Sequence, residues 1–130
     1  MKTALLPDGH TVLAPDGSRI HELVQTSRSS MVHCTLGPGS VSKAVAHRTV
    51  EEAWYFISGC GQVWRADDSN EEVVDVFAGV ALTIDTGSHF QFRNTGDEDL
   101  CFVIVTTPAW PGMEEAYPVP NYWPTPADNE

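Results

Sequence analysis

Short stretches in which apolar and polar residues alternate recur along most of this chain, and they constrain its fold more than any other feature. The alternation has the two-residue period of a β-strand and not the 3.6-residue period of an amphipathic helix. Eight such stretches, rich in Val, Ile, Phe, Trp and Thr, are expected to be strands: 19–25, 31–36, 53–58, 62–66, 72–77, 80–84, 90–93 and 100–106. Turn sequences such as GPG, GCG and NTGD separate several of them. Many short strands joined by turns predict an all-β sandwich or barrel.

The composition fits one domain and argues against two classes of partner. A chain of 130 residues, 42% of them hydrophobic, is large enough for a single packed core. Seven Lys and Arg residues stand against 18 Asp and Glu residues, which gives a formal net charge of −11. Binding to nucleic acid or to an anionic membrane surface needs a basic patch, so we expect neither partner.

The cysteines and the apolar runs bear on the compartment. Cys34, Cys60 and Cys101 are widely spaced and form no CxxC pair, which favours reduced thiols in the cytoplasm over a disulfide framework. The N-terminal sequence MKTALLPDGH has no signal-peptide pattern. No apolar run approaches the roughly 20 residues that would cross a bilayer. We therefore expect a cytoplasmic protein.

The two ends of the chain differ from its centre. Residues 107–130 carry most of the nine prolines and four large aromatic residues, Trp110, Tyr117, Tyr122 and Trp123. Proline lacks the N–H donor that a central strand needs, whereas the aromatic side chains need an apolar surface to cover them. We expect 107–130 to be an extended tail that wraps the barrel or a neighbouring subunit. Residues 1–27 are expected to complete the barrel with strands and hairpins, and 28–106 to form its core.

Two motifs bounded by glycine have a specific spacing. The first runs Gly39, five residues, Val45-Ala46-His47, four residues, Glu52, six residues, Gly59. The second runs Gly79, five residues, Asp85-Thr86-Gly87, two residues, Phe90, three residues, Asn94. This spacing resembles the two motifs of the cupin superfamily, G-(five)-H-x-H-(three or four)-E-(six)-G and G-(five)-P-x-G-(two)-H-(three)-N. The resemblance covers about residues 28–106.

The resemblance implies a double-stranded β-helix, a small jelly roll whose ligand cavity lies in the mouth of the barrel. Cupin metal sites consist of three histidines and one glutamate on Fe, Mn, Ni, Zn or a similar ion. His47 and Glu52 stand at two of these four positions, but Val45 and Phe90 at the other two offer no lone pair. Two protein ligands hold a divalent transition ion weakly, so we expect no tightly bound metal and no cofactor.

The alternative is one divalent transition metal, such as Zn, Fe, Mn or Ni, on His47, Glu52 and a third group. Successive side chains of a strand point to opposite faces, so His89 points outward if Phe90 points inward. A bulge or a one-residue slip would reverse this arrangement. His33 lies in a stretch that is partly apolar on both faces, so the sequence does not show to which face its side chain points.

The inward positions predict a cavity that is mostly aromatic. Counted by two from Glu52, Trp54 and Phe56 point inward, and Phe92 shares the face of Phe90. Such a cavity with few polar groups is typical of a small-molecule site. We take Trp54, Phe56, Phe90 and Phe92 as candidate substrate-binding residues.

His47 and Glu52 are the candidate catalytic residues. Burial would raise the pKa of Glu52 and lower that of His47, while their mutual attraction would oppose both shifts. A His/Glu pair of this kind is suited to moving protons at neutral pH, with His47 as the better base. The alternative is a core pair with no catalytic role.

Two further side chains are candidates for the substrate site. Arg48, beside His47, could bind a substrate carboxylate, or form a surface salt bridge with Glu51. Trp64 follows the GCG turn and could be a ligand platform or part of the core.

Three classes of function remain. The first is a metal-independent enzyme of isomerase, dehydratase or cyclase type that acts on a small, partly apolar organic molecule. The second is a non-catalytic carrier or sensor of a small ligand, and the third is a metal-dependent dioxygenase or isomerase with an unusual ligand set. The fold alone does not choose among them. Strand 100–106 is apolar on both faces, both of which need cover, so we also expect a homodimer.

Overall fold

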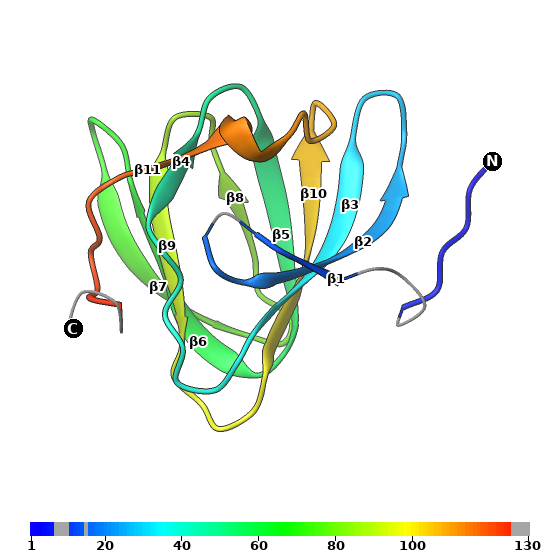
Figure 1. The fold of residues 1–130 in the computed structure, drawn as a ribbon. Coiled ribbons are helices and arrows are strands. Elements are labelled where there is room, and N and C mark those ends of the chain that lie inside the picture. Colours follow the sequence, from blue (N-terminus) through cyan, green and yellow to red (C-terminus); the bar gives the residue numbers. More distant parts are fainter. Residues whose placement is uncertain (7–10, 15, 126–130) are drawn as a thin grey trace.

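Two antiparallel β-sheets face each other and form a barrel in the computed structural model, which describes residues 1–6, 11–14 and 16–125 (Figure 1). The six-stranded sheet has the order β1 (Thr11–Leu13), β2 (Arg19–Gln25), β3 (Ser30–Leu36), β10 (Leu100–Thr107), β5 (Glu51–Ser58), β8 (Ala81–Ile84). The five-stranded sheet has the order β11 (Ala116–Pro118), β4 (Val45–His47), β9 (His89–Asn94), β6 (Cys60–Ala66), β7 (Glu71–Phe77). The predicted all-β barrel is confirmed. Parts of the predicted end segments, residues 7–10, 15 and 126–130, lie outside the described residues.

All eight predicted strands are present, and each lies within two residues of its predicted bounds. The sequence did not indicate β1, β4 and β11, which have three residues each and are too short to show an alternation. All three residues of β4 are buried, because β9 and β11 flank this strand on its two edges. The single 3-10 turn of the described chain, η1 (Met113–Glu115), directly precedes β11.

The connections predicted at 59–61 and 94–97 are tight, and both cross from one sheet to the other. Gly59 alone joins β5 to β6 with a φ of 80°, a backbone conformation that favours glycine. Gly61, one position into β6, lies so close to the carbonyl oxygen of Arg93 that a Cβ would clash with it. Gly59 therefore allows the tight turn between the sheets, and Gly61 allows β6 to approach the neighbouring strand β9 closely.

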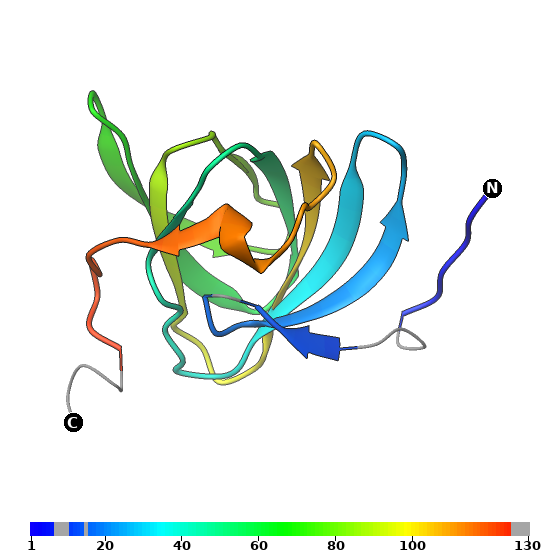
Figure 2. The ribbon, with the colours of Figure 1, turned by 45° about the horizontal axis from the view of Figure 1, so that its top comes forward.

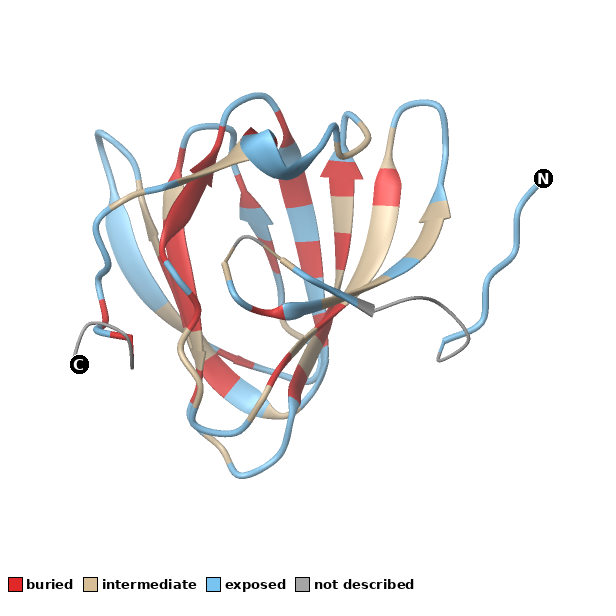
Figure 3. Ribbon diagram, viewed as in Figure 1, coloured by how far each residue is buried: buried red, intermediate tan, exposed pale blue. Residues whose placement is uncertain are grey.

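An aromatic cluster fills much of the interior between the sheets. Buried and exposed residues alternate along β5 (Figure 3). Trp54 and Phe56 are at buried positions and point inward as predicted. Phe90 and Phe92 of β9 pack against Trp54, and their ring centroids lie 5.5 and 5.4 Å from the centroid of Trp54. Phe102 of β10 stacks on Phe56 at 4.6 Å. Both inward sets predicted from strand parity are therefore confirmed.

The described part of the C-terminal tail packs on its own barrel. Segment η1–β11 crosses the mouth of the barrel (Figure 2), and the chain beyond it covers the outer face of the five-stranded sheet. There the guanidinium carbon of Arg93 lies over the ring of Trp123, 4.4 Å from the ring centroid. Gln91 donates to the carbonyl oxygens of Ser42 and Trp123 and accepts from the backbone N–H groups of Tyr122 and Trp123. Gln91 shares the outward parity of His89, which is typical of a solvated or an interface residue, and here the tail buries it completely.

Two further findings concern membrane-spanning helices and the cysteines. None of the helices in the described ranges is long and apolar enough to cross a membrane. Cys34, Cys60 and Cys101 are all free thiols, as their spacing predicts.

Candidate functional site

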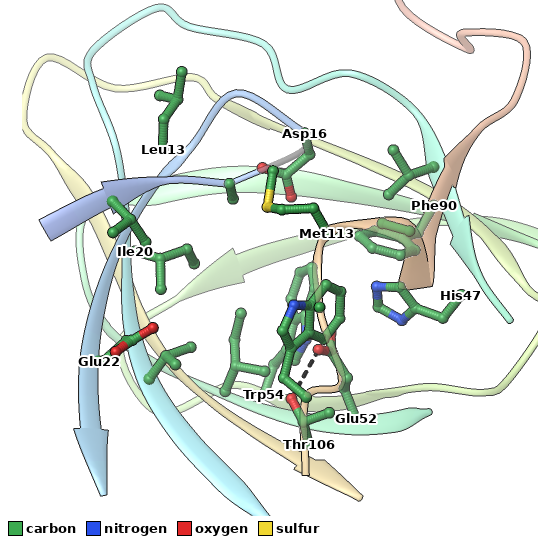
Figure 4. A pocket seen from close by; sticks show the side chains of 18 residues that line it. Leu13, Asp16, Ile20, Glu22, His47, Glu52, Trp54, Phe90, Thr106 and Met113 are labelled. Carbon is green, nitrogen blue, oxygen red and sulfur yellow. Dashed lines mark hydrogen bonds between the residues drawn. The ribbon is translucent and has the colours of Figure 1, made fainter. Parts of the chain in front are cut away.

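A cavity of about 360 Å³ opens in the mouth of the barrel, between the two sheets and under segment η1–β11 (Figure 4). Its volume is at the small end of the range for small-molecule sites. Most of its lining is apolar, and the polar side chains among the described lining residues are Asp16, Glu22, His47, Glu52 and Thr106. The two candidate catalytic residues therefore face the same space, although they come from different sheets.

Glu52 lies on β5 with its carboxyl group buried and held at both oxygens. Trp54 Nε1 donates to Oε1 over 2.9 Å, and Thr106 Oγ1 donates to Oε2 over 3.0 Å. Thr106 is the register partner of Glu52 on the adjacent strand β10, so the sheet itself positions this contact. Burial raises the pKa of Glu52 from 4.5 to about 7, although the two hydrogen bonds act in the opposite direction. At neutral pH the protonated and ionised forms of Glu52 are therefore both populated.

His47 ends the short strand β4, and only 3% of it is exposed. Its ring meets the edges of Phe90 and Trp110, at centroid distances of 5.1 and 5.3 Å. Burial lowers the pKa of His47 from 6.5 to about 4, so that the imidazole is neutral at neutral pH. Its buried Nδ1 has no hydrogen-bond partner in the described chain. A ligand that bonds to Nδ1 would satisfy a polar atom that is otherwise costly to bury.

The expected mutual attraction of His47 and Glu52 is not among the causes of either pKa shift. Both residues are described, and no hydrogen bond joins them, since Glu52 is bound to Trp54 and Thr106. The negative charge that opposes the lowered pKa of His47 belongs to Glu115 of η1. Oε1 of Glu115 accepts hydrogen bonds from the backbone N–H groups of Thr49 and Val50 and so holds η1 against the loop after β4.

The candidate substrate-binding residues divide into two groups. Trp54 and Phe90 line the cavity. Phe56 and Phe92 are completely buried in the aromatic cluster behind these two rings, and neither is part of the described lining.

Arg48 and Trp64 also lie outside the described lining of the cavity. Arg48 is exposed, donates from Nε to the carbonyl oxygen of Glu114, and lies 4.7 Å from the ring centroid of Tyr117. Trp64 faces outward from β6, where it stacks on Tyr122 of the tail at 5.2 Å. Its indole N–H donates to Glu71. Trp64 is therefore part of the contact between barrel and tail, and strand parity alone could not show the tail above it.

The residues present do not fit a tightly held metal ion. Val45 and Phe90, at two of the four ligand positions implied by the cupin motifs, line the cavity with apolar side chains. Both carboxylate oxygens of Glu52 already accept hydrogen bonds. No three His, Cys, Asp or Glu side chains of the described ranges are grouped so that they could hold an ion.

Neither histidine considered as a third ligand reaches the cavity. His89 contributes to a separate shallow depression together with Asp85 and Ser88. His33 is half-buried, and its register partners on the adjacent strands are His21 and Val103. Burial and the nearby His21 both lower the pKa of His33. The described lining of the cavity includes neither His89 nor His33.

Sequence reasoning missed five side chains that shape the site, namely Asp16, Glu22, Thr106, Trp110 and Glu115. Thr106 has a detectable signal, because pairing of β10 with β5 would place it beside Glu52. Asp16, Glu22 and Trp110 reach the cavity from loops and from strand β2, and Glu115 lies in η1; no residue spacing indicates the paths of these segments.

Comparison with known proteins identifies the fold. The family model described as "Cupin domain" matches residues 32–106, more than half of the chain. No curated protein gave a significant match.

Three solved structures illustrate the likeness. Oxalate decarboxylase from Bacillus subtilis has 19% identity and a TM-score of 0.76 over 91% of this chain, which spans about a third of that protein (32%). An uncharacterized conserved protein with a double-stranded β-helix domain from Klebsiella pneumoniae has 19% identity and a TM-score of 0.66 over 92% of both chains. The nucleoside dehydratase Pac13 has 14% identity and a TM-score of 0.71 over 92% of this chain and 91% of its own. These similarities show the double-stranded β-helix and, at such identities, the fold alone.

Proposed function

This chain belongs to the cupin family, and we propose that it binds a small, partly apolar organic molecule in the barrel and catalyses a proton transfer on it. The proposed chemistry is that of an isomerase, a dehydratase or a cyclase that works without a metal. One observation carries the proposal: Glu52 is a buried carboxyl group with a pKa of about 7, and it faces an apolar cavity. A general acid or base is most effective when its pKa lies near the working pH.

The opposite effects of burial on the two pKa values favour Glu52 over His47 as the group that moves the proton. A base with a pKa of about 4, such as His47, has less affinity for a substrate proton than Glu52, whose pKa is about 7. The hydrogen bonds from Trp54 and Thr106 fix the orientation of the carboxyl group without removing its ability to exchange a proton. His47 then acts as a neutral hydrogen-bonding group toward the substrate, through the unpartnered Nδ1.

Fold similarity supports the choice of lyase chemistry at a general level. The nucleoside dehydratase Pac13 has the same fold and matches this chain over nearly its whole length. A barrel of this size can therefore contain the active site of a dehydratase, although a fold by itself does not determine a substrate. The three free thiols support the cytoplasm as the compartment in which this reaction takes place.

The proposal is tested by hydrogen exchange at carbon. The protein is incubated in D₂O with a panel of small ketones and β-hydroxy ketones, and NMR measures deuterium incorporation next to the carbonyl group. Glu52→Gln keeps an acceptor for Trp54 and a polar partner for Thr106, so the barrel should stay folded. The catalysed exchange should fall by roughly 10²-fold or more, the usual contribution of a positioned acid or base.

The matched control is Glu51→Gln, which removes one negative charge from an exposed position on the same strand and should leave exchange unchanged. If Glu52→Gln exchanges as fast as the wild type, Glu52 is not the acid or base. If a compound binds in the cavity but the wild type catalyses no exchange, the protein is a ligand-binding cupin and not an enzyme.

A further inference from the structure

The charged side chains among the described lining residues of the cavity are all acidic. The acidic side chains in its described lining are Asp16, Glu22 and Glu52, and no Lys or Arg is among the described lining residues. His47, the remaining titratable group, is neutral at neutral pH because burial lowers its pKa to about 4. Figure 4 shows the three carboxyl groups at different points around the same space. An anionic ligand would meet only repulsion here, in a site where water screens charges poorly.

Asp16 has no positively charged partner in the described chain. It precedes β2, and its Oδ1 accepts hydrogen bonds from the backbone N–H and the hydroxyl of Ser18, over 2.9 and 2.6 Å. The two ion pairs of the described residues, Arg19 with Asp99 and Arg65 with Glu72, lie elsewhere. Burial raises the pKa of Asp16. The negative charge of Asp16 is also one of the causes that raise the pKa of Glu52, so the two carboxyl groups repel each other.

A positive charge placed between Asp16 and Glu52 would relieve this repulsion, and the surroundings favour an organic cation over a metal ion. The acidic and histidine side chains of the described ranges include no group of three that could hold one ion. Trp54, Phe90 and Trp110 line the same cavity. Aromatic faces attract ammonium groups, most strongly where water is excluded.

We propose that the ligand of this cavity is a small amine bound in its protonated form, with Asp16 as the residue that selects the positive charge. This rests on the proposed function only in placing the ligand in the barrel. The ammonium group lies between Asp16 and Glu52 and donates hydrogen bonds to Asp16, and the apolar part of the ligand packs on the aromatic rings. Glu22, exposed at the mouth, adds to the attraction.

A cationic ligand should displace protons from the site. Besides Asp16, Glu115 also raises the pKa of Glu52 by its charge. A bound cation opposes both effects and favours the ionised carboxyl group. Because the pKa of Glu52 is about 7, amine binding at pH 7 should release up to about half a proton from this residue. A neutral ligand should release none.

Three probes that share a phenyl ring and a similar chain length test the assignment: 2-phenylethylamine, 2-phenylethanol and 3-phenylpropionate. Binding is followed by the fluorescence of Trp54 and Trp110, which line the cavity. The amine should bind about tenfold or more tightly than the alcohol, as one charge-assisted hydrogen bond predicts. The carboxylate should bind more weakly than the alcohol. Calorimetry of the amine in two buffers with different ionisation enthalpies measures the proton release.

Asp16→Asn tests the selecting residue, because the amide oxygen can still accept both hydrogen bonds from Ser18. Its affinity for the amine should fall about tenfold, and its affinity for the alcohol should stay within about twofold. Asp97→Asn is the matched control: Asp97 is exposed in the turn between β9 and β10, and this change alters the net charge equally. Asp97→Asn should leave the binding of both probes unchanged.

Each other outcome contradicts a specific statement. If amine and alcohol bind equally, or if Asp16→Asn does not weaken the amine, the amine assignment is wrong while the proposed function stands. If none of the three probes binds, the cavity is not a site for small, partly apolar molecules and both proposals fail. Should Asp16→Asn not fold, the wild type decides, since binding the amine no more tightly than the alcohol refutes the assignment.

Discussion

Replacing Glu52 with glutamine should change how the stability of the protein depends on pH. In the folded chain the pKa of Glu52 is about 7, against an ordinary value of 4.5. Between these two pH values the folded state holds more protons than the unfolded state, so the free energy of unfolding falls as the pH rises. The difference between about 7 and 4.5, at about 1.4 kcal/mol for each pH unit, amounts to about 3 kcal/mol.

His47 acts in the opposite direction over a nearby range. Its pKa is about 4 in the folded chain, against 6.5 ordinarily, so its contribution to the free energy of unfolding rises with pH between these values. In the wild type the two trends oppose each other from about pH 4.5 to 6.5. The informative quantity is therefore the stability of Glu52→Gln minus that of the wild type, in which the contribution of His47 cancels.

Urea unfolding followed by tryptophan fluorescence, repeated from pH 4 to pH 8, measures this difference. We expect it to rise by about 3 kcal/mol in favour of Glu52→Gln, mainly between pH 4.5 and pH 7. Glu51→Gln controls for the loss of one charge on the same strand. A difference that stays constant across this range would refute the reasoning, because Glu52 would then not be held in a desolvated environment. The main support for its role as acid or base would be lost as well.

Three other predictions concern the core, the tail and the assembly. Phe90→Ala should lower the free energy of unfolding by about 3 to 5 kcal/mol and weaken binding of the probes; a loss below about 1 kcal/mol in urea would contradict this. Gln91→Leu removes the acceptor for two backbone N–H groups of the tail, so the tail should detach more readily. Chymotrypsin should then cut near Tyr122 sooner than in the wild type. Equal resistance of the two proteins would contradict the role of Gln91 in holding the tail. Light scattering of the wild type should give the mass of a dimer. Ile57→Lys, which places a charge on the apolar outer face of β5, should give the mass of one chain. A wild-type mass of one chain at every concentration would exclude the dimer.

The sequence predicted the parts of the fold that depend on local pattern. A period of two residues over five or more positions identifies a strand, because side chains of a strand alternate between its faces. The same rule placed Trp54, Phe56, Phe90 and Phe92 inside the barrel. It does not work for three-residue strands such as β4, where His47 lies. Only the fixed spacing of the two cupin motifs drew attention to His47.

What the sequence alone determined, then, is the barrel, the inward aromatic set and the presence of His47 and Glu52 inside it. The tertiary structure decided what these residues do, because the environment of a charge depends on neighbours that are distant in sequence. Glu115 and not Glu52 acts on the charge of His47, Thr106 and Trp54 hold Glu52, and Asp16 is brought to the cavity by the loop before β2. Gln91 likewise has the outward position that parity predicts, yet it is buried, because a tail some 30 residues further along the chain covers it and forms three hydrogen bonds with it. Alternation along a strand determines the direction of a side chain, whereas its desolvation depends on what the rest of the chain places beside it.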